Sequence, residues 1–203
     1  MTAARDFSTL AAGFHDSARE AQALFRRVLQ AVARPGRVAD LSAAPAPPEG
    51  LDRAAAALAL TLCDAETPVW LGARLAEGPI RDWLAFHCSA PQAATPADAA
   101  FALVDAGACP PLDAFAQGEA RHPDRSATVI LICEALEGGA RRRVVGPGID
   151  GEIVIAPKGL PPEFWSDWTA NTARFPLGVD ALLVAGASLL ALPRTARVEL
   201  IEG

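Results

Sequence analysis

Residues 175–195 read FPLGVDALLVAGASLLALPRT and hold the pattern that decides the fold. An apolar run from Ala181 to Val184 is followed by the small-residue turn Ala185-Gly186-Ala187 and by a second apolar run from Leu189 to Leu192. Two short apolar runs around a glycine turn predict a buried β-hairpin. The hairpin by itself indicates a globular core and no particular activity.

The composition predicts one domain with a substantial core. The chain has 203 residues, of which 51% are hydrophobic, and its mean hydropathy is +0.22. We therefore expect a single domain over residues 1–203, with a flexible N-terminus over residues 1–13. The net charge of -6 and the pI near 5.1 argue against a nucleic-acid-binding protein, which usually carries a basic surface.

The cysteines and the apolar stretches indicate the cellular compartment that we expect for the protein. Four separate cysteines form no Cys-x-x-Cys pair, so there is no zinc-ribbon or thioredoxin signature: Cys63, Cys88, Cys109 and Cys133. The sequence opens without a charged-then-apolar leader, which predicts a cytoplasmic protein with reduced thiols. The longest apolar stretch, residues 181–192, is shorter than the ~20 residues of a membrane span, so we expect no membrane partner.

The first strong element is a helix over residues 16–34. Ser17 and Glu20 have the spacing of a capping box. Six apolar residues recur at helical spacing and predict one apolar face: Ala21, Leu24, Phe25, Val28, Leu29 and Val32. Pro35-Gly36 ends the helix.

The remaining pattern predicts an α/β domain in which a mixed β-sheet is flanked by helices. Asp52 is expected to cap an alanine-rich helix ending near Leu62, and Pro79 to begin a helix that carries Trp83 and His87. A short helical turn is expected over residues 111–117 and a helix over 161–172. Strands are expected over residues 38–41, 68–71, 100–104, 127–133, 142–145, 153–155 and 197–201, besides the hairpin.

Two features of the sequence resemble parts of cofactor sites, but each is better explained without a bound cofactor. Residues 146–151 match G-x-G-x-x-G, but the following Glu152-Ile153-Val154-Ile155 reads as a strand, so we expect a turn between two strands instead of a dinucleotide site. Lys158 is the only lysine, and it lies in the loop-like Ala-Pro-Lys-Gly-Leu-Pro-Pro. We expect a solvated lysine and no pyridoxal phosphate, and we predict no cofactor.

Three histidines are present, His15, His87 and His122, and none lies at metal-ligand spacing from another ligand type, so we expect no metal site. His87 falls at a helix end, where it either caps or packs, or else acts as a general base. Asp64 and Asp180 flank apolar segments, where a carboxylate either takes part in chemistry or organises a turn.

Positive charge gathers around the first helix and on a later segment. Arg26 and Arg27 lie on the helix, Arg34 and Arg37 at its exit, and Arg141–Arg143 on a predicted strand. Arginine binds phosphate bidentately. These residues therefore either bind phosphate groups or form a solvated helix face and a charged edge strand.

An ordered set of segments resembles one family, the H subunit of the bacterial carbon–phosphorus lyase system (PhnH). The resemblance runs from about residue 14 to residue 198, and the tract 45–53 departs from it most. Its main pieces are Phe25-Arg26-Arg27, Thr67-Pro68-Val69-Trp70-Leu71, Phe86-His87, Gly146 with Gly148-Ile149, Phe175-Pro176-Leu177-Gly178 with Asp180, and Pro193-Arg194-Thr195.

The resemblance implies a fold, partners and a role. It implies a fold like that of pyridoxal-phosphate-dependent transferases without the cofactor, and a homodimer when the subunit is alone. It implies a complex with the G, I and J subunits in organophosphonate breakdown. With the G, I and L proteins the family supports ATP-dependent formation of ribose 1-methylphosphonate 5-triphosphate, and the I subunit is held to carry the chemistry.

Three hypotheses follow. The first is an accessory subunit of this assembly, with a large apolar surface to which Trp70, Trp83, Trp165 and Trp168 contribute, unless all four are core. The second is an enzyme subunit with its own site at a dimer interface, in which arginines hold phosphate and other groups move protons. Its phosphate-binding candidates are Arg26, Arg27 and Arg194, and its proton-transfer candidates are His87, Asp64 and Asp180. The third is a sensor that uses the arginines without chemistry.

Overall fold

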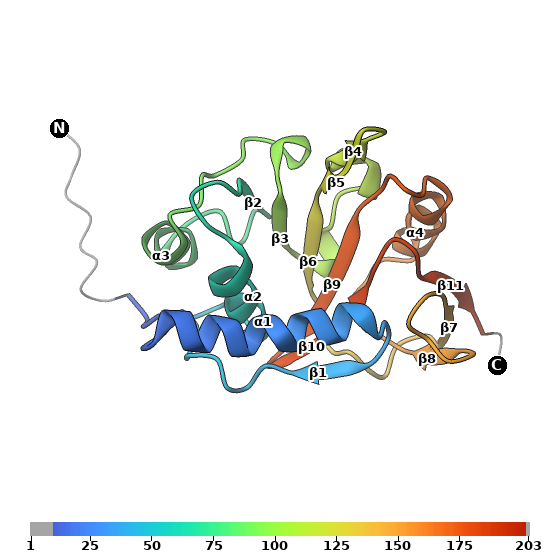
Figure 1. Cartoon of the computed structure of the whole chain (residues 1–203), viewed down its shortest axis with the longest axis horizontal. Coiled ribbons are helices and arrows are strands. Elements are labelled where there is room, and N and C mark those ends of the chain that lie inside the picture. The colour runs from blue at the N-terminus through green and yellow to red at the C-terminus, as the bar shows by residue number, and fades with distance from the viewer. Residues whose placement is uncertain (1–9, 202–203) are drawn as a thin grey trace.

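The computed structural model describes residues 10–201 as a mixed α/β fold (Figure 1). The helices are α1 (Ser17–Ala33), α2 (Arg53–Leu62), α3 (Pro79–Cys88) and α4 (Glu163–Ala173). The strands are β1 (Val38–Asp40), β2 (Val69–Leu71), β3 (Phe101–Asp105), β4 (Gln117–Glu119), β5 (His122–Ser126), β6 (Thr128–Ile132), β7 (Arg142–Val145), β8 (Ile153–Ile155), β9 (Asp180–Ala185), β10 (Ser188–Leu192) and β11 (Arg197–Leu200). Three 3-10 turns span Pro96–Asp98, Ala106–Ala108 and Leu112–Ala114.

The predicted terminal hairpin lies inside the main sheet. β9 and β10 pair antiparallel from Ser188 opposite Ala185 to Leu192 opposite Ala181. The strand order is β1-β10-β9-β6-β3-β2, so the hairpin lies between β1 and β6. The strands β2, β3, β6 and β9 are parallel to one another, and β10 and β1 are antiparallel to their neighbours. The mixed sheet and the hairpin predicted from sequence are confirmed.

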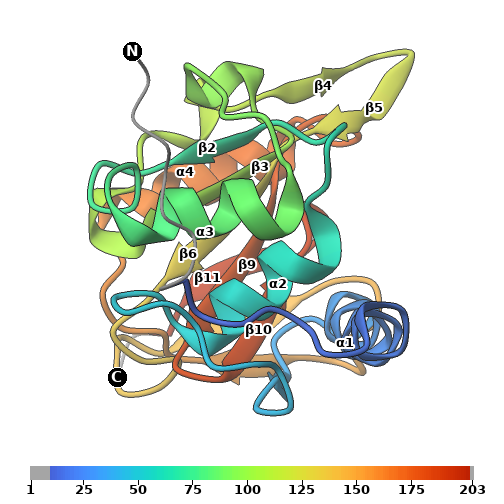
Figure 2. The ribbon, with the colours of Figure 1, turned by 90° about the vertical axis from the view of Figure 1, so that its left-hand side faces the viewer.

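The sheet separates two apolar cores. Helices α1 to α3 cover one face, and α4 with the small sheet β11-β7-β8 covers the other (Figures 1 and 2). Along β9, Leu182 and Val184 face the first core, whereas Ala181 and Leu183 face the second. Side chains alternate between the faces of a strand, and here both faces are covered, which is why this strand reads as an uninterrupted apolar run.

Helix α1 differs from its prediction in its cap and in its buried face. Asp16, not Ser17, is the N-cap, and its carboxylate accepts a hydrogen bond from the Arg19 amide. Glu20 accepts a hydrogen bond from the Asp16 amide in return, so the two side chains are still reciprocal, with the cap one residue earlier and four residues from Glu20. Of the predicted apolar face, only two residues are fully buried, Leu24 and Val28, and Ala21 is half-buried. The other three are 39% to 50% exposed, namely Phe25, Leu29 and Val32, because α1 lies at the edge of the sheet where only one strip is covered.

Helix α2 begins at the turn of the hairpin. Asp52 is at the N-cap position as expected, but its side chain makes no capping bond. Its carboxylate instead accepts a hydrogen bond from the Gly186 amide at 2.7 Å, and the Ala54 amide donates to the Gly186 carbonyl at 2.9 Å. The Asp52 carboxylate therefore joins the α2 terminus to the β9–β10 turn.

The G-x-G-x-x-G segment is the expected turn between antiparallel strands, here β7 and β8. Gly148 has a φ of +83°, and a Cβ placed on it would overlap the carbonyl oxygen of Ala33. The glycine is therefore needed where the turn packs against the end of α1. One hairpin, β4–β5, was not predicted from the sequence.

The N-terminal segment enters the description at residue 10. Leu10 and Ala11 are partly buried against the core beneath α1 to α3. Residues 1–9 lie outside the described part of the chain, and the flexibility expected over residues 1–13 stays a prediction.

Candidate functional site

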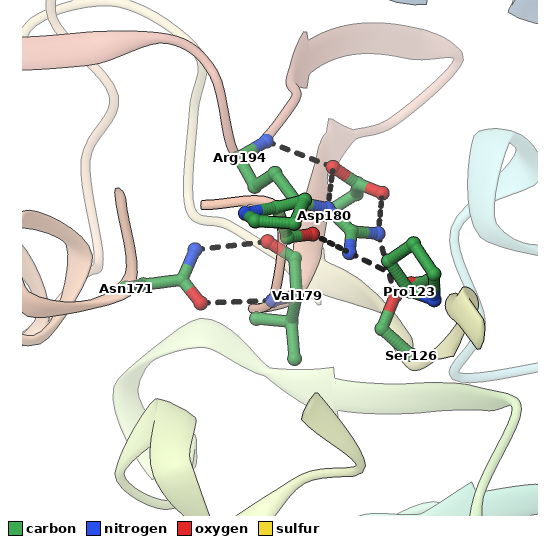
Figure 3. A network of polar contacts seen from close by, with 7 residues as sticks. Pro123, Ser126, Asn171, Val179, Asp180 and Arg194 are labelled. Carbon is green, nitrogen blue, oxygen red and sulfur yellow. Dashed lines mark hydrogen bonds and ion pairs between the residues drawn. The ribbon is translucent and has the colours of Figure 1, made fainter. Parts of the chain in front are cut away.

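Arg194 and Asp180 form the densest polar network among residues 10–201 (Figure 3). The guanidinium contacts both Asp180 oxygens, through Nε at 3.2 Å and Nη2 at 2.6 Å. Nη1 donates to the carbonyls of Pro123 at 3.1 Å and Pro176 at 3.3 Å, and Nη2 donates to Ser126 Oγ at 2.5 Å.

These contacts engage all five N–H donors of the Arg194 guanidinium. The side chain is 13% exposed, and the Arg194 amide also donates to Asp180. A phosphate at Arg194 would therefore have to displace a bond that the fold already makes. The network joins the start of β9, the end of β10 and the β4–β5 hairpin, and it carries a structural role.

Asn171 extends the same region on the helix side. It is the buried polar side chain of the described core, at 2% exposure. Its Oδ1 accepts from the Val179 amide at 2.8 Å, and its Nδ2 donates to the Val179 carbonyl at 2.9 Å (Figure 3). The side chain thus satisfies both backbone groups of a residue with no solvent exposure.

His87 holds the N-terminal segment. The His87 Nε2 and the Trp83 Nε1 both lie within hydrogen-bond distance of the Ala11 carbonyl, at 3.0 Å and 2.9 Å. A Cβ on Gly13 would lie 2.6 Å from His87 Nδ1, so the chain crosses directly over the imidazole. Of the two roles considered for His87, packing and general-base catalysis, the packing role accounts for these contacts.

We predict that His87→Ala loosens residues 10–14 while the fold persists. The expected loss is about 1 kcal/mol, because Trp83 keeps its bond to Ala11. Faster hydrogen exchange of this segment, measured by mass spectrometry, checks the prediction. His87→Gln is the matched variant, since the amide retains an N–H donor but cannot act as a base. The opposing result would be that both variants abolish the enzymatic activity of the chain assembled with the other subunits, while hydrogen exchange of residues 10–14 is unchanged in His87→Gln. That result would contradict the structural role and favour general-base catalysis.

The other carboxylate candidate, Asp64, organises a turn. Its Oδ1 accepts from the Glu66 amide at 2.9 Å and from Thr67 Oγ1 at 3.1 Å. Asp64 and His87 lie in segments next to β2, whereas Asp180 begins β9. β2 and β9 are separated by three strand spacings, roughly 14 Å. Within one chain the structure therefore pairs Asp180 with Arg194 and brings neither Asp64 nor His87 to them.

The α1 arginines remain on the surface. Arg27 donates to the Asp40 carbonyl at 2.6 Å and lies 3.6 Å from the Asp40 carboxylate, while Arg26 is exposed and makes no hydrogen bond or ion pair within residues 10–201. Lys158 is on the surface as predicted, 60% exposed and paired with Glu134 at 3.1 Å.

Comparison with known proteins shows the family. The model of the bacterial phosphonate metabolism protein family (PhnH) matches residues 12–199. This chain belongs to the PhnH family. A Rhizobium meliloti (strain 1021) relative named alpha-D-ribose 1-methylphosphonate 5-triphosphate synthase subunit PhnH is 47% identical over 187 residues, which is 92% of this chain and 94% of that protein. The HtxG protein of Stutzerimonas stutzeri is 37% identical over 83 residues, 41% of this chain and 43% of its own length.

Two further arginine arrangements in this PhnH-family chain differ in how far the sequence indicated them. Arg74 contacts both oxygens of Asp105 at the carboxyl end of β3, at 2.7 Å and 2.5 Å, and donates to the Gly50 carbonyl. Arg34 and Arg37 join Arg27 along a groove between α1 and β1. The sequence signalled the second arrangement as clustered charge, but the first pair is 31 residues apart and gave no signal.

Other reactive groups are sparse in the described PhnH-family structure. Burial raises the pKa of the Cys88, Cys109 and Cys133 thiols to about 12, so few thiolates form at neutral pH. Within residues 10–201, no three His, Cys, Asp or Glu side chains gather closely enough to ligate a metal ion. None of the helices described there has the length and apolar character needed to cross a membrane.

Proposed function

We propose that this chain is an accessory subunit of the bacterial carbon–phosphorus lyase system. In this role it supports ATP-dependent formation of alpha-D-ribose 1-methylphosphonate 5-triphosphate in organophosphonate catabolism. The observation that carries the proposal is the 47% identity, over nearly the full length of both chains, to a relative named as a subunit of that synthase. The proposed compartment is the cytoplasm, and the proposed fold relationship is to pyridoxal-phosphate-dependent transferases without the cofactor.

The side-chain contacts support an accessory role over a catalytic one. Arg194, Asp180 and His87 each make contacts that hold the fold together, and Asp64 organises a turn. Of the four tryptophans, Trp83 and Trp168 have no exposure and belong to the core. The other two, Trp70 and Trp165, are partly buried against the second core. Exposed apolar side chains instead occur on α1, at Phe25 and Leu29 among others.

The alternative is a phosphate- or phosphonate-binding catalytic site at a dimer interface. Arg26 favours it, because this arginine is exposed on α1 and makes no hydrogen bond or ion pair within residues 10–201. Such a site would need residues of a second copy, since the described chain alone does not bring Asp64 or His87 to the Asp180–Arg194 pair. Arg26→Gln would then reduce phosphonate binding by the homodimer, measured by calorimetry, and would have no such effect in an accessory subunit.

Co-expression with the G, I and J subunits tests the proposed function. We expect the tagged chain to purify with them as one assembly, with its mass and stoichiometry measured by native mass spectrometry. The same chain expressed alone is expected to be a homodimer. A chain that does not bind the three subunits at micromolar concentration would contradict the accessory role.

A further inference from the structure

The outer edge of β1 is an open edge of the main sheet. β1 pairs only with β10 in the described chain, and it is the last strand in the order (Figure 1). The opposite edge is covered, because the Val69 amide donates to the Pro91 carbonyl and the Ala93 amide donates to the Val69 carbonyl. An open edge presents backbone donors and acceptors to another chain.

The register identifies which backbone groups face outward. The Leu41 amide donates to the Ala187 carbonyl at 2.8 Å, in line with the pairing of Ala39 opposite Leu189. Bonding alternates along an antiparallel strand, so the groups of Val38 and Asp40 point away from β10. Arg27 occupies the Asp40 carbonyl. The N–H and C=O of Val38 and the N–H of Asp40 have no partner within residues 10–201.

A groove lies on each side of this edge. The first, of about 310 Å³, lies between α1 and β1, and the second, of about 430 Å³, lies between β1 and the segment 136–139 with β8. Val38 lines both grooves and is 51% exposed. An added strand would direct alternate side chains into the two grooves, which is how strand-addition sites combine backbone affinity with side-chain selectivity.

The two grooves differ in charge. Arg27, Arg34 and Arg37 line the first groove and face one acid, Asp40. Hydrogen bonds from Ser42 hold the pKa of the Asp40 carboxyl below its usual value, so this acid is ionised at neutral pH and the groove keeps a positive excess. This excess occurs in a chain of net charge -6. The second groove is lined by apolar residues that include Val154 and Leu190, with Glu137 and Arg141 balancing one another.

We propose that an extended acidic segment of a partner subunit adds to β1 as a further strand. Its carboxylates lie in the α1 groove against the three arginines, and its alternate apolar side chains lie against Val38, Leu190 and Val154. The inference rests on the proposed function, because that function supplies the partner subunits. A second copy fits the edge less well, since pairing β1 with its own equivalent would bring two sets of three arginines together.

Two variants test the edge in the full chain co-expressed with the G, I and J subunits. Val38→Pro removes an outward-facing N–H and leaves the bonds to β10 in place. Arg34→Glu with Arg37→Glu reverses the charge of the α1 groove and leaves the backbone edge intact. We expect each to weaken association at least about tenfold. The matched control, Arg121→Glu with Arg125→Glu, makes the same charge change on the exposed β4–β5 hairpin and should associate as the unsubstituted chain does.

Hydrogen exchange reports the strand pairing directly. In the assembly, the amides of Val38 and Asp40 should exchange at least about tenfold more slowly than in the chain alone. If all variants associate equally and the amides of Val38 and Asp40 do not exchange more slowly in the assembly, strand addition at β1 is refuted and the proposed function is left intact. An unsubstituted chain that does not associate would instead refute the proposed function together with the partner. Slowing in the chain alone at rising concentration would show that a second copy occupies the edge and would overturn the inference.

Discussion

Replacing Arg194 with alanine is expected to lower the free energy of unfolding by about 3 to 5 kcal/mol. The change leaves the Asp180 carboxylate, Ser126 Oγ and two proline carbonyls without the donor that they share. The Arg194 side chain is largely buried, so water replaces these bonds poorly. Urea unfolding followed by circular dichroism measures the loss.

Two further variants separate charge from geometry at this position. Arg194→Lys keeps the charge but not the planar fork of five donors, so it should recover only a small part of the stability. Arg197→Ala removes an exposed arginine three residues later and should change the free energy of unfolding by less than about 0.5 kcal/mol. An Arg194→Ala protein as stable as Arg197→Ala would contradict the structural role and return Arg194 to the phosphate-binding candidates.

Replacing Asn171 with leucine is expected to cost about 3 to 4 kcal/mol, because it leaves two buried backbone groups of Val179 without partners. The leucine is close to asparagine in size, so the loss reports the hydrogen bonds more than a cavity. Thermal and urea unfolding both measure it.

The control for Asn171 is its neighbour. Thr172→Ala removes a hydroxyl that bonds only within α4, to the Thr169 carbonyl, and should cost less than about 0.5 kcal/mol. Asn171→Gln retains the amide but displaces it by one methylene. A Cβ on Gly178 would lie 2.7 Å from the Asn171 oxygen, so there is little room for this shift and the variant should also be destabilised. Unchanged stability of both Asn171→Leu and Asn171→Gln would mean that the backbone groups of Val179 find other partners.

The sequence was informative about the fold where burial sets the pattern. The β9–β10 hairpin was predicted because both faces of the sheet are covered, which makes its letters apolar throughout. The β4–β5 hairpin was missed because residues 117–126 are polar and contain Pro123, so they show no alternation of apolar residues. Half of the predicted apolar face of α1 is exposed, since periodicity identifies an apolar face but not how far its neighbours extend over it.

The candidate site was less predictable, because side-chain roles depend on partners that are distant in the chain. Arg194 looked like a phosphate ligand from its residue type. Its donors are instead taken by carbonyls at residues 123 and 176, and backbone carbonyls leave no mark in a sequence. For Asp64 the sequence also predicts turn chemistry, and its contacts are those of a local turn. His87 instead contacts the Ala11 carbonyl, 76 residues away, and no local pattern indicates that partner.

The central place of the hairpin also constrains the order in which the chain can fold. β1 pairs only with β10 in the described structure, yet it is synthesised long before residues 188–192. Until the hairpin leaves the ribosome, α1 lacks its contacts with β10 and α2 lacks its contacts with β9. A nascent chain at that stage exposes apolar surface, which is prone to aggregation. Messages truncated before Asp180 should therefore yield insoluble fragments instead of smaller folded domains.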